Sequence, residues 1–486
     1  MNIPYPTKKL FALIFFITFI IRASLFYMYI QHEERYRQPD TMDYHNCAIG
    51  LAFGTGMHRA DNLKPIFWRT PGYPLLLAAA YKACHIDHSS FDKNHTAQKI
   101  FLWIQIAICS FTPIILFYLA FLLTSQLLIA YIIAIMAMLH PGFILASMYL
   151  LTEGFAIMLF YLFLLLFYYS FNAYGEHLQK HRYWILSITG SALTLAAYTW
   201  MRPMGEFVAI VTAILIIIVS QESIQLKAKK SILFLFIFFS CLAPWYMRNY
   251  KLTGEWFFCP MSGAYLNSFI APKIVRSLNN CPIDKAIGYC YYLAQKEADK
   301  EEQKCMNTGY TVSRESMAKR IAWPIIMAYP LLAFKEWMQE VTKTTFDLYS
   351  YQLTALIAGT FHYDPLEEFL SIKTKETLWL QPMPCWVRMI AWTEVAWMIW
   401  LWIGLLAGFW LFMLNPFIKR KTIQPITGLW IKTAPLIWAV VGMTGGFGYA
   451  RLRLPIEPLM IILALPWWLH YRNTKKGIPH KQNNCI

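Results

Sequence analysis

Long apolar runs alternate with short polar segments along most of this chain. Several runs approach or exceed the roughly 20 apolar residues that a helix needs to cross the hydrocarbon core of a membrane. The pattern predicts ten spanning helices, at residues 10–30, 100–122, 126–146, 150–171, 184–201, 205–220, 231–247, 391–414, 427–446 and 456–471. The first run contains Arg22 and lacks a small-residue cleavage site, so we expect it to stay as a span rather than to act as a signal peptide. The prediction is ten spans, give or take two, because the connections within 126–171 and 184–220 are short.

Basic residues predict how these spans are oriented, because short cytoplasmic loops are enriched in Lys and Arg. With the N-terminus inside, the longer inside segments carry fourteen Lys and Arg residues against two acids; these segments are 1–9, 172–183, 221–230, 415–425 and 472–486. Ten spans then return the C-terminus to the cytoplasm. We therefore expect a multi-pass protein of the inner or plasma membrane with both termini cytoplasmic.

Composition agrees with a membrane protein. The chain is 57% hydrophobic and only 14% charged, whereas soluble proteins carry about 25% charged residues. The net charge of +16 follows from basic residues at span ends, so it does not indicate nucleic-acid binding. No Walker A motif and no Rossmann glycine fingerprint occurs. The predicted fold class is an all-α polytopic membrane protein.

Two external segments are too long to be simple turns, and they divide the chain into three parts. Residues 1–247 form an N-terminal transmembrane module with a first external loop at 31–98, residues 248–390 form an external region, and residues 391–486 form a C-terminal transmembrane module. The inside segments are all short. We therefore expect the chemistry at the external face, which argues against cytosolic nucleotide sugars or ATP as direct substrates.

Within the external segments, helical periodicity recurs. An apolar face at Tyr44–Ala52 and the apolar stretch 73–84 predict two short helices at the membrane interface. In the second external region, 284–304 and 313–345 read as helices, with a break near Pro324 and Pro330. Seven of the ten cysteines are predicted to be external, where a disulfide is permitted, but the spacing decides neither a pairing nor a zinc site.

The first external loop holds the leading candidate for catalysis. Asp40 precedes an amphipathic helix that carries Tyr44, and Asp43 is a rival acid nearly one turn later. An Asp at this position can also serve only as a helix N-cap. Further along, Arg69 opens the stretch Arg-Thr-Pro-Gly-Tyr-Pro-Leu-Leu-Leu, in which the prolines fix the backbone and turn the loop back to the membrane.

Other candidates lie at the outer ends of predicted spans, and they are Glu153, Arg202, Arg248, Asn249, Arg451 and Arg453. An ionisable group at the edge of a span is costly and often functional. A guanidinium can hold a phosphate through two hydrogen bonds. The structural alternatives are an acid that favours a helix N-terminus and arginines that reach for lipid headgroups.

Taken in order, these motifs resemble the polyprenyl-phosphate-sugar glycosyltransferases of the GT-C class. The resemblance points to family 39, which includes protein O-mannosyltransferases and aminoarabinose transferases. It rests on Asp40 with Tyr44, the stretch from Arg69, Thr152-Glu153, Arg202-Pro203, the Pro-Trp-x-x-Arg-Asn-Tyr run that ends at Tyr250, and Arg453-Leu-Pro with Pro458. The chain departs from the family where Thr70 replaces a proline, and where the tyrosine usual before the last prolines is missing.

The resemblance implies a GT-C helical bundle with external interfacial helices. It implies inverting transfer of a sugar from a polyprenyl-phosphate-linked donor to a glycan, lipid or protein acceptor. Asp40 and Glu153 would be catalytic, and the substrate-binding set would be Tyr44, Arg69, Arg202, Arg248, Asn249, Arg451 and Arg453.

A cofactor is not specified by the sequence. No His, Asp and Glu cluster has metal-binding spacing, and a divalent ion shared by Asp40 and Glu153 is left open. The alternative functions are a transporter or flippase of a lipid-linked glycan and a scaffold of an envelope complex. A flippase should carry polar residues along a path at mid-span, and Arg22 is the clearest mid-span charge.

Overall fold

The computed structural model describes residues 8–38, 40–58, 64–85, 94–172, 183–220, 222–305, 310–346, 349, 385–418, 424–444 and 453–465. Within these ranges the chain is helical apart from turns, loops and one isolated bridge between His58 and Pro65. The helices before the external subdomain are α1 (Lys8–Tyr29), α2 (Glu33–Tyr36), α3 (Thr41–Ala52), α4 (Gly72–Ala83), α5 (Asn94–Cys109), α6 (Thr112–Thr124), α7 (Leu127–Leu139), α8 (Pro141–Met148), α9 (Glu153–Asn172), α10 (Tyr183–Met201), α11 (Gly205–Val219) and α12 (Ile224–Thr253).

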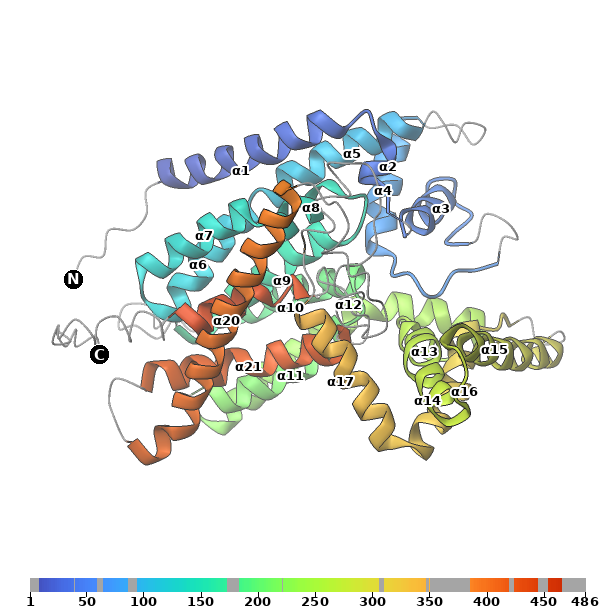
Figure 1. Cartoon of the computed structure of the whole chain (residues 1–486). Coiled ribbons are helices and arrows are strands. Elements are labelled where there is room, and N and C mark those ends of the chain that lie inside the picture. Colours follow the sequence, from blue (N-terminus) through green and yellow to red (C-terminus); the bar gives the residue numbers. More distant parts are fainter. Residues whose placement is uncertain are drawn as a thin grey trace.

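The remaining elements build a helical subdomain, α13 to α17, which we call the external subdomain after its predicted location, and the last apolar helices. They are α13 (Met261–Tyr265), the π-helix η1 (Leu266–Ile270), α14 (Ala271–Asn279), α15 (Ile283–Cys305), α16 (Arg314–Ala328), α17 (Pro330–Phe346), α20 (Cys385–Ile418) and α21 (Gln424–Thr444). A final helical stretch runs from 457 to 465. The helices α2, α3 and α13 to α16 gather at one end of the bundle (Figure 1).

Every predicted span overlaps a described helix. By length and composition, five described helices can cross a membrane: Lys8–Tyr29, His95–Thr124, Glu153–Ser170, Ile224–Thr253 and Trp392–Trp410. The pair α7 and α8, bent by 50°, would make a sixth, and α11 is apolar but shorter. The prediction of an all-α polytopic membrane protein is confirmed, whereas the total of ten spans and the side of each terminus stay predictions.

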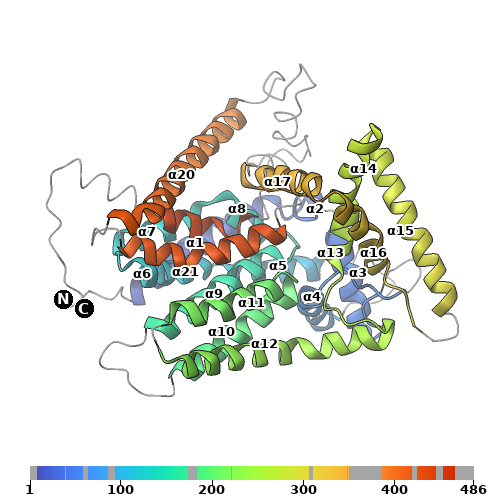
Figure 2. The ribbon, with the colours of Figure 1, turned by 90° about the horizontal axis from the view of Figure 1, so that it is seen from below.

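The centre of the bundle is α9. It packs against α6 and α10, while α10, α11, α12 and α21 continue the row of neighbours seen in Figure 2. Side chains on several sides of α9 are buried, among them Phe160, Phe163 and Phe167, as expected for a helix without a polar face. Because Glu153 is the first residue of α9, its carboxylate lies at the end of the most buried of the five candidate spans.

Both loop-one helices form as predicted, with their apolar faces turned inward. Tyr44, Cys47 and Ala48 of α3 are buried, and α3 packs along α4. On α4, Tyr73 and Leu77 are buried. The position of these helices relative to a membrane stays a prediction.

The second external region differs from the prediction at one proline. Helix α16 runs through Pro324 and ends at Ala328, so the break occurs only before Pro330. The predicted boundaries after residues 247 and 390 both fall within helices, because α12 ends at Thr253 and α20 begins at Cys385. The division into three parts itself stays a prediction.

Two breaks in the bundle converge on Arg22, which is only 1% exposed. Its Nη1 donates to the carbonyl of Cys109, the last residue of α5, at 2.7 Å. Its Nη2 lies 3.5 Å from the carbonyl of Ala137 in the last turn of α7. Helix C-termini leave carbonyls without partners, and a cation there satisfies them. Arg22 therefore holds the two breaks side by side.

We predict that Arg22→Met lowers the thermal unfolding midpoint of the detergent-solubilised chain. The variant keeps the bulk of the side chain but leaves buried carbonyls without a hydrogen-bond donor. Each such carbonyl lowers the free energy of unfolding by about 1–3 kcal/mol. Phe16→Met, at a 57% exposed position of the same helix, is the matched control. Equal midpoints for both variants would contradict the role of Arg22.

Candidate active site

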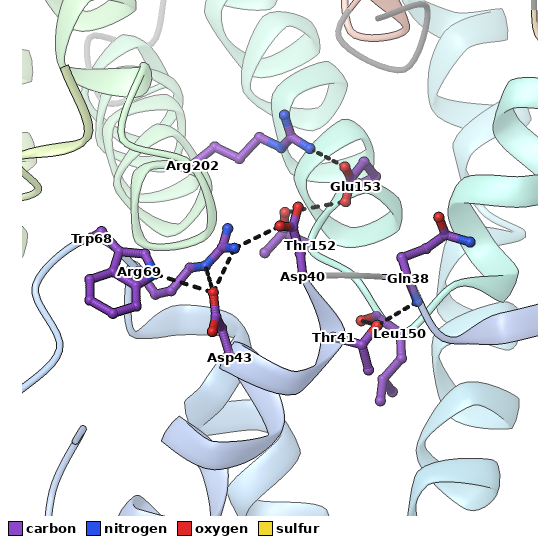
Figure 3. A network of polar contacts seen from close by, with 10 residues as sticks. All are labelled: Gln38, Asp40, Thr41, Asp43, Trp68, Arg69, Leu150, Thr152, Glu153 and Arg202. Carbon is purple, nitrogen blue, oxygen red and sulfur yellow. Dashed lines mark hydrogen bonds and ion pairs between the residues drawn. The ribbon is translucent and has the colours of Figure 1, made fainter. Parts of the chain in front are cut away.

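Asp40 stands at the start of α3 but does not cap the helix. It occupies the N-cap position, and its side chain makes no capping hydrogen bond. Instead Oδ1 accepts a hydrogen bond from Nη2 of Arg69 at 2.7 Å (Figure 3). About a third of the Asp40 side chain is exposed. The purely structural reading of this acid as an N-cap is therefore not supported by its contacts.

Asp43, one turn further along α3, is held more heavily. Its Oδ2 accepts from Nε of Arg69 at 3.0 Å, from Nη2 of Arg69 at 2.8 Å and from Nε1 of Trp68 at 3.2 Å. Three donors around one oxygen leave little room there for a substrate hydroxyl. Arg69 thus bridges the two acids of α3, and Asp43 acts as its anchor.

The segment that carries Arg69 is fixed to the outer end of α10. The hydroxyl of Thr70 donates to the carbonyl of Met201 at 2.8 Å. Gly72 lies so near the backbone that a Cβ there would come within 2.6 Å of the carbonyl oxygen of Trp200. Thr70, which stands where the resembled family has a proline, therefore links this segment to the end of α10. A proline could not donate this hydrogen bond.

A second ion pair joins α9 to the residue after α10. Oε1 of Glu153 lies 2.6 Å from Nη2 of Arg202, and both side chains are nearly buried. The hydroxyl of Thr152 lies 3.4 Å from Oε2 of Glu153. An acid that is favoured at a helix N-terminus is here also compensated by a guanidinium, as burial of a charge requires.

Tyr44 lies between the two ion pairs. The guanidinium carbon of Arg69 stands 5.0 Å from the centre of its ring. Burial raises the pKa of the Tyr44 phenol; Arg69 and Arg202 oppose this rise, whereas Glu153 and Asp40 add to it. All four charged side chains therefore act on one phenol. Tyr44 stays protonated near neutral pH and is suited to donate a hydrogen bond rather than to remove a proton.

The charge on Arg69 is secure in this setting. Burial alone would lower the pKa of its guanidinium, but Tyr44, Asp40 and Asp43 together outweigh burial and hold that pKa above its ordinary value. A permanent cation of this kind can orient Asp40 without exchanging protons with it.

Arg248 approaches the same loop from α12. It stacks on Trp245 at 4.5 Å and on Phe67 at 5.2 Å. Its hydrogen bonds go to neutral oxygens: the side chain of Asn249 at 2.8 Å, and the carbonyls of Met57 at 3.4 Å and Ile66 at 3.5 Å. No ion pair joins it to an acid in the part of the chain that the structure describes. Its charge is therefore available to an anionic ligand.

Asn249 is fully buried and serves the fold. Its Nδ2 donates to the carbonyls of Phe257 and Phe258 at 2.9 and 3.0 Å. Its Oδ1 accepts from Nη1 of Arg248. Asn249 thus orients Arg248, and its predicted contact with substrate stays untested.

Arg453 belongs to a separate cluster. The side chain is 1% exposed, and it pairs with Glu457 at 3.3 Å. Nη1 donates to the carbonyls of Thr344 and Thr345 near the end of α17, at 3.1 and 2.7 Å. Its predicted contact with phosphate stays untested, and its observed contacts fix α17 to the bundle. Arg451 lies outside the described residues.

Residues that the sequence did not single out complete this second cluster. Oε1 of Glu457 lies 3.1 Å from Nε2 of His140, and Oε2 accepts from the hydroxyl of Tyr349 at 3.1 Å. The one available signal was the spacing of Arg453 and Glu457, four residues apart on a helix. Tyr349 and His140 gave no signal, because only the packing of α8 brings them together.

A narrow cleft connects the two clusters. It measures about 320 Å³ including its open mouth, and Glu153 lies on one wall while Tyr349 and Leu454 lie on the other. Most of the remaining lining is apolar and comes from α8 and the residues after it; the lining residues there are Gly142, Leu145, Ala146, Tyr149 and Leu151. Glu153 therefore contributes a carboxylate to a lining that is otherwise mostly apolar.

The metal ion that the sequence left open concerns Asp40 and Glu153. Among the described residues, no group of three or more His, Cys, Asp or Glu side chains is placed to hold a metal ion. Asp40 and Glu153 each hold a guanidinium, from Arg69 and Arg202 respectively. A divalent ion shared by these two acids stays untested.

Comparison with known proteins identifies the fold. No protein-family model and no curated protein matches the chain. Among solved structures, the chain is similar to the archaeal oligosaccharyltransferase AglB from Archaeoglobus fulgidus, described in complex with an inhibitory peptide and a dolichol-phosphate. The match has a TM-score of 0.52 and 12% identity, and covers 97% of this chain. The chain spans about half, 52%, of that protein. The chain therefore has a fold similar to that of the corresponding half of this protein.

His45, a buried residue of α3, belongs to a network of hydrogen bonds with Tyr81 and Gln98. Nδ1 of His45 lies 2.7 Å from the hydroxyl of Tyr81, and Nε2 of Gln98 lies 3.1 Å from the same ring nitrogen. Burial, helped by the charges of Arg37 and His95, lowers the pKa of His45 to about 4. The ring is therefore neutral in the folded protein at neutral pH.

We predict that this histidine makes stability depend on pH. Between pH 6.5 and 4 the unfolded chain protonates His45 and the folded chain does not, so stability falls as the pH falls, by up to about 3 kcal/mol. Thermal midpoints measured from pH 7.5 to 5 should decline less steeply for His45→Gln than for the natural chain. The exposed His32, changed to Gln, is the control. Parallel curves for all three chains would refute the prediction.

Proposed function

We propose that this chain is a membrane glycosyltransferase of family 39. It takes a sugar from a polyprenyl-phosphate-linked donor and transfers it, with inversion, to a glycan, lipid or protein acceptor at the external face. One observation carries the proposal. Two carboxylates with their own guanidinium partners, Asp40 with Arg69 and Glu153 with Arg202, lie close together at one end of the bundle (Figure 3). The similarity in fold to a lipid-linked oligosaccharide enzyme supports it.

The reaction is a single displacement at the anomeric carbon. The carboxylate of Asp40 accepts the proton of the acceptor hydroxyl as its oxygen bonds to the anomeric carbon. The bond from that carbon to the phosphate oxygen breaks, and its electron pair leaves on the phosphate. Attack from the face opposite the phosphate inverts the configuration. The proton ends on Asp40 and the new negative charge on the lipid phosphate.

We propose Asp40 rather than Asp43 as the base, because Asp40 is the acid that the resemblance to the family marks. Both acids are about one-third exposed, but the Oδ2 of Asp43 already accepts three hydrogen bonds. Arg69 contacts both acids and so fixes the direction of Asp40 through Asp43. We assign Asp43 and Arg69 as positioning residues on this basis.

The leaving phosphate needs a cation whose charge is not already neutralised. Arg248 meets this requirement best among the candidate arginines, because its described partners are neutral oxygens and aromatic rings. Its contacts with the carbonyls of Met57 and Ile66 and with the ring of Phe67 lie in the first loop. Charge-assisted hydrogen bonds from a guanidinium to the phosphate would favour its departure.

Glu153 and Arg202 complete the proposed site. Because Glu153 lines the cleft while paired to Arg202, it can accept a hydrogen bond from a sugar or acceptor hydroxyl without carrying an unpaired charge. The orientation that we propose, with the site external and both termini cytoplasmic, follows from the distribution of basic residues.

The transporter alternative finds no specific support in these contacts. Its expected sign was a polar path at mid-span, and Arg22 was the best candidate. Arg22 is buried and donates to the backbone carbonyls of two helix breaks. It therefore contributes to the fold of the bundle.

The test is deletion of the gene in its host, with mass spectrometry of envelope lipids and glycans. We expect one sugar to be missing and its lipid-linked donor to accumulate. The natural chain should restore the sugar. Asp40→Asn should insert normally and yet lose about 10²-fold to 10⁴-fold of the transfer rate, because the variant cannot accept a proton.

Asp284→Asn, at an exposed position of the external subdomain, is the matched control and should restore the sugar fully. Full rescue by Asp40→Asn would remove Asp40 as the base. An unchanged set of lipids and glycans after deletion would refute the transferase.

A further inference from the structure

The junction of α16 and α17 exposes an unusual amount of apolar surface. We call residues 321–334 the elbow; they contain no charged residue in an external region that is otherwise rich in charge. Figure 1 shows the elbow at the edge of the molecule, where α17 leaves the bundle and meets α16. The exposed side chains are Trp323, Met327, Tyr329, Leu331 and Phe334, and Leu331 is 84% exposed.

The elbow has one covered side and one uncovered side. Ile325 and Ile326 pack inward against Ile270, Ile274 and neighbouring residues of the external subdomain. The exposed residues point elsewhere at helical spacing, at 323 and 327 on α16 and at 331 and 334 on α17. A contiguous apolar patch of this kind marks a contact with a partner or a membrane.

Basic residues flank the elbow and indicate which kind of surface covers its exposed apolar side chains. Residues 316–335 include Lys319, Arg320 and Lys335 and no acid. Arg320 pairs with Glu255, whereas no ion pair of Lys319 or Lys335 occurs among the described residues. Aromatic side chains with flanking lysines are typical of segments in the headgroup region of a bilayer, where lysines meet lipid phosphates.

The elbow is also held firmly near the bundle. Arg453 ties the end of α17 to the bundle through the carbonyls of Thr344 and Thr345. Lys273 of α14 forms an ion pair with Glu340 in the middle of α17. The elbow therefore keeps a fixed position beside a bundle that spans the membrane, so the bilayer itself is the surface within its reach.

We propose that the elbow is a membrane-interface anchor. It inserts Trp323, Met327, Leu331 and Phe334 into the headgroup region of the outer leaflet, while Lys319 and Lys335 bind lipid phosphates. The external subdomain thereby rests on the membrane at two places, the spans and the elbow. The inference is independent of the proposed enzymatic reaction.

The test uses the full chain in liposomes of phosphatidylcholine and phosphatidylglycerol. The photoreactive residue benzoylphenylalanine replaces Leu331, or replaces the 62% exposed Tyr291 of α15 as the matched control. Figure 1 shows α15 at the far side of the external subdomain from the bundle. After illumination, intact mass spectrometry should find phospholipid attached at position 331 and none at 291.

Every other result overturns the proposal. Crosslinking of position 331 to a second copy of the chain would identify a protein interface instead. Equal lipid attachment at both positions would indicate contact without an anchor, and no attachment at 331 would place the elbow in water.

A second measurement separates anchoring from folding. In lipid nanodiscs, Leu331→Glu combined with Phe334→Glu should speed hydrogen exchange in α16 and α17, while Tyr291→Glu should not. In detergent micelles the charged double variant should still show the natural exchange pattern in α15, because the side chains changed are exposed. Unchanged exchange of α16 and α17 in nanodiscs would overturn the anchor.

Discussion

The bridge from Arg69 to Asp40 and Asp43 is the contact on which the proposed site depends. One guanidinium neutralises two acids on the same helix and joins them to the loop that returns to the membrane. Without it, two carboxylates would face each other beside the buried Tyr44, and a third, Glu153, would lie close by. Acidic side chains can lie close together at the end of an apolar bundle only where arginines pair with them, because an unpaired buried charge is costly.

The bundle supplies the frame for that bridge through two helix breaks. Arg22 satisfies carbonyls at both breaks, so α5 and α7 end side by side. The chain then turns through α8 and a short segment to Glu153. Gln105 donates to the carbonyls of Ser147 and Tyr149, and the amide of Leu150 donates to the carbonyl of Tyr36. Arg22, a charged residue of α1, thereby helps to fix the segment that leads to Glu153 at the start of α9.

The candidate residues separate into two groups in space. Asp40, Tyr44, Arg69, Glu153 and Arg202 converge, and their approach required only that the first loop fold back on the bundle. Arg453 instead lies in a buried cluster across the cleft. The sequence could not separate the two groups. An arginine at the end of a span gives the same sequence pattern whether its side chain faces a ligand or the end of another helix. His140 and Tyr349 were missed for a related reason: their contacts join segments that are far apart in the chain.

The sequence by itself determined the helices and the membrane class, because spans, periodicity and loop charges are local properties of consecutive residues. It also determined which residue types could carry the proposed chemistry. Only the tertiary structure decided how Arg69 joins the two acids of α3, because that depends on where Arg69 and Trp68 meet this helix. The same holds for the elbow, whose apolar residues could have been buried. Which face of a helix is covered follows from packing between distant segments, and no local pattern records it.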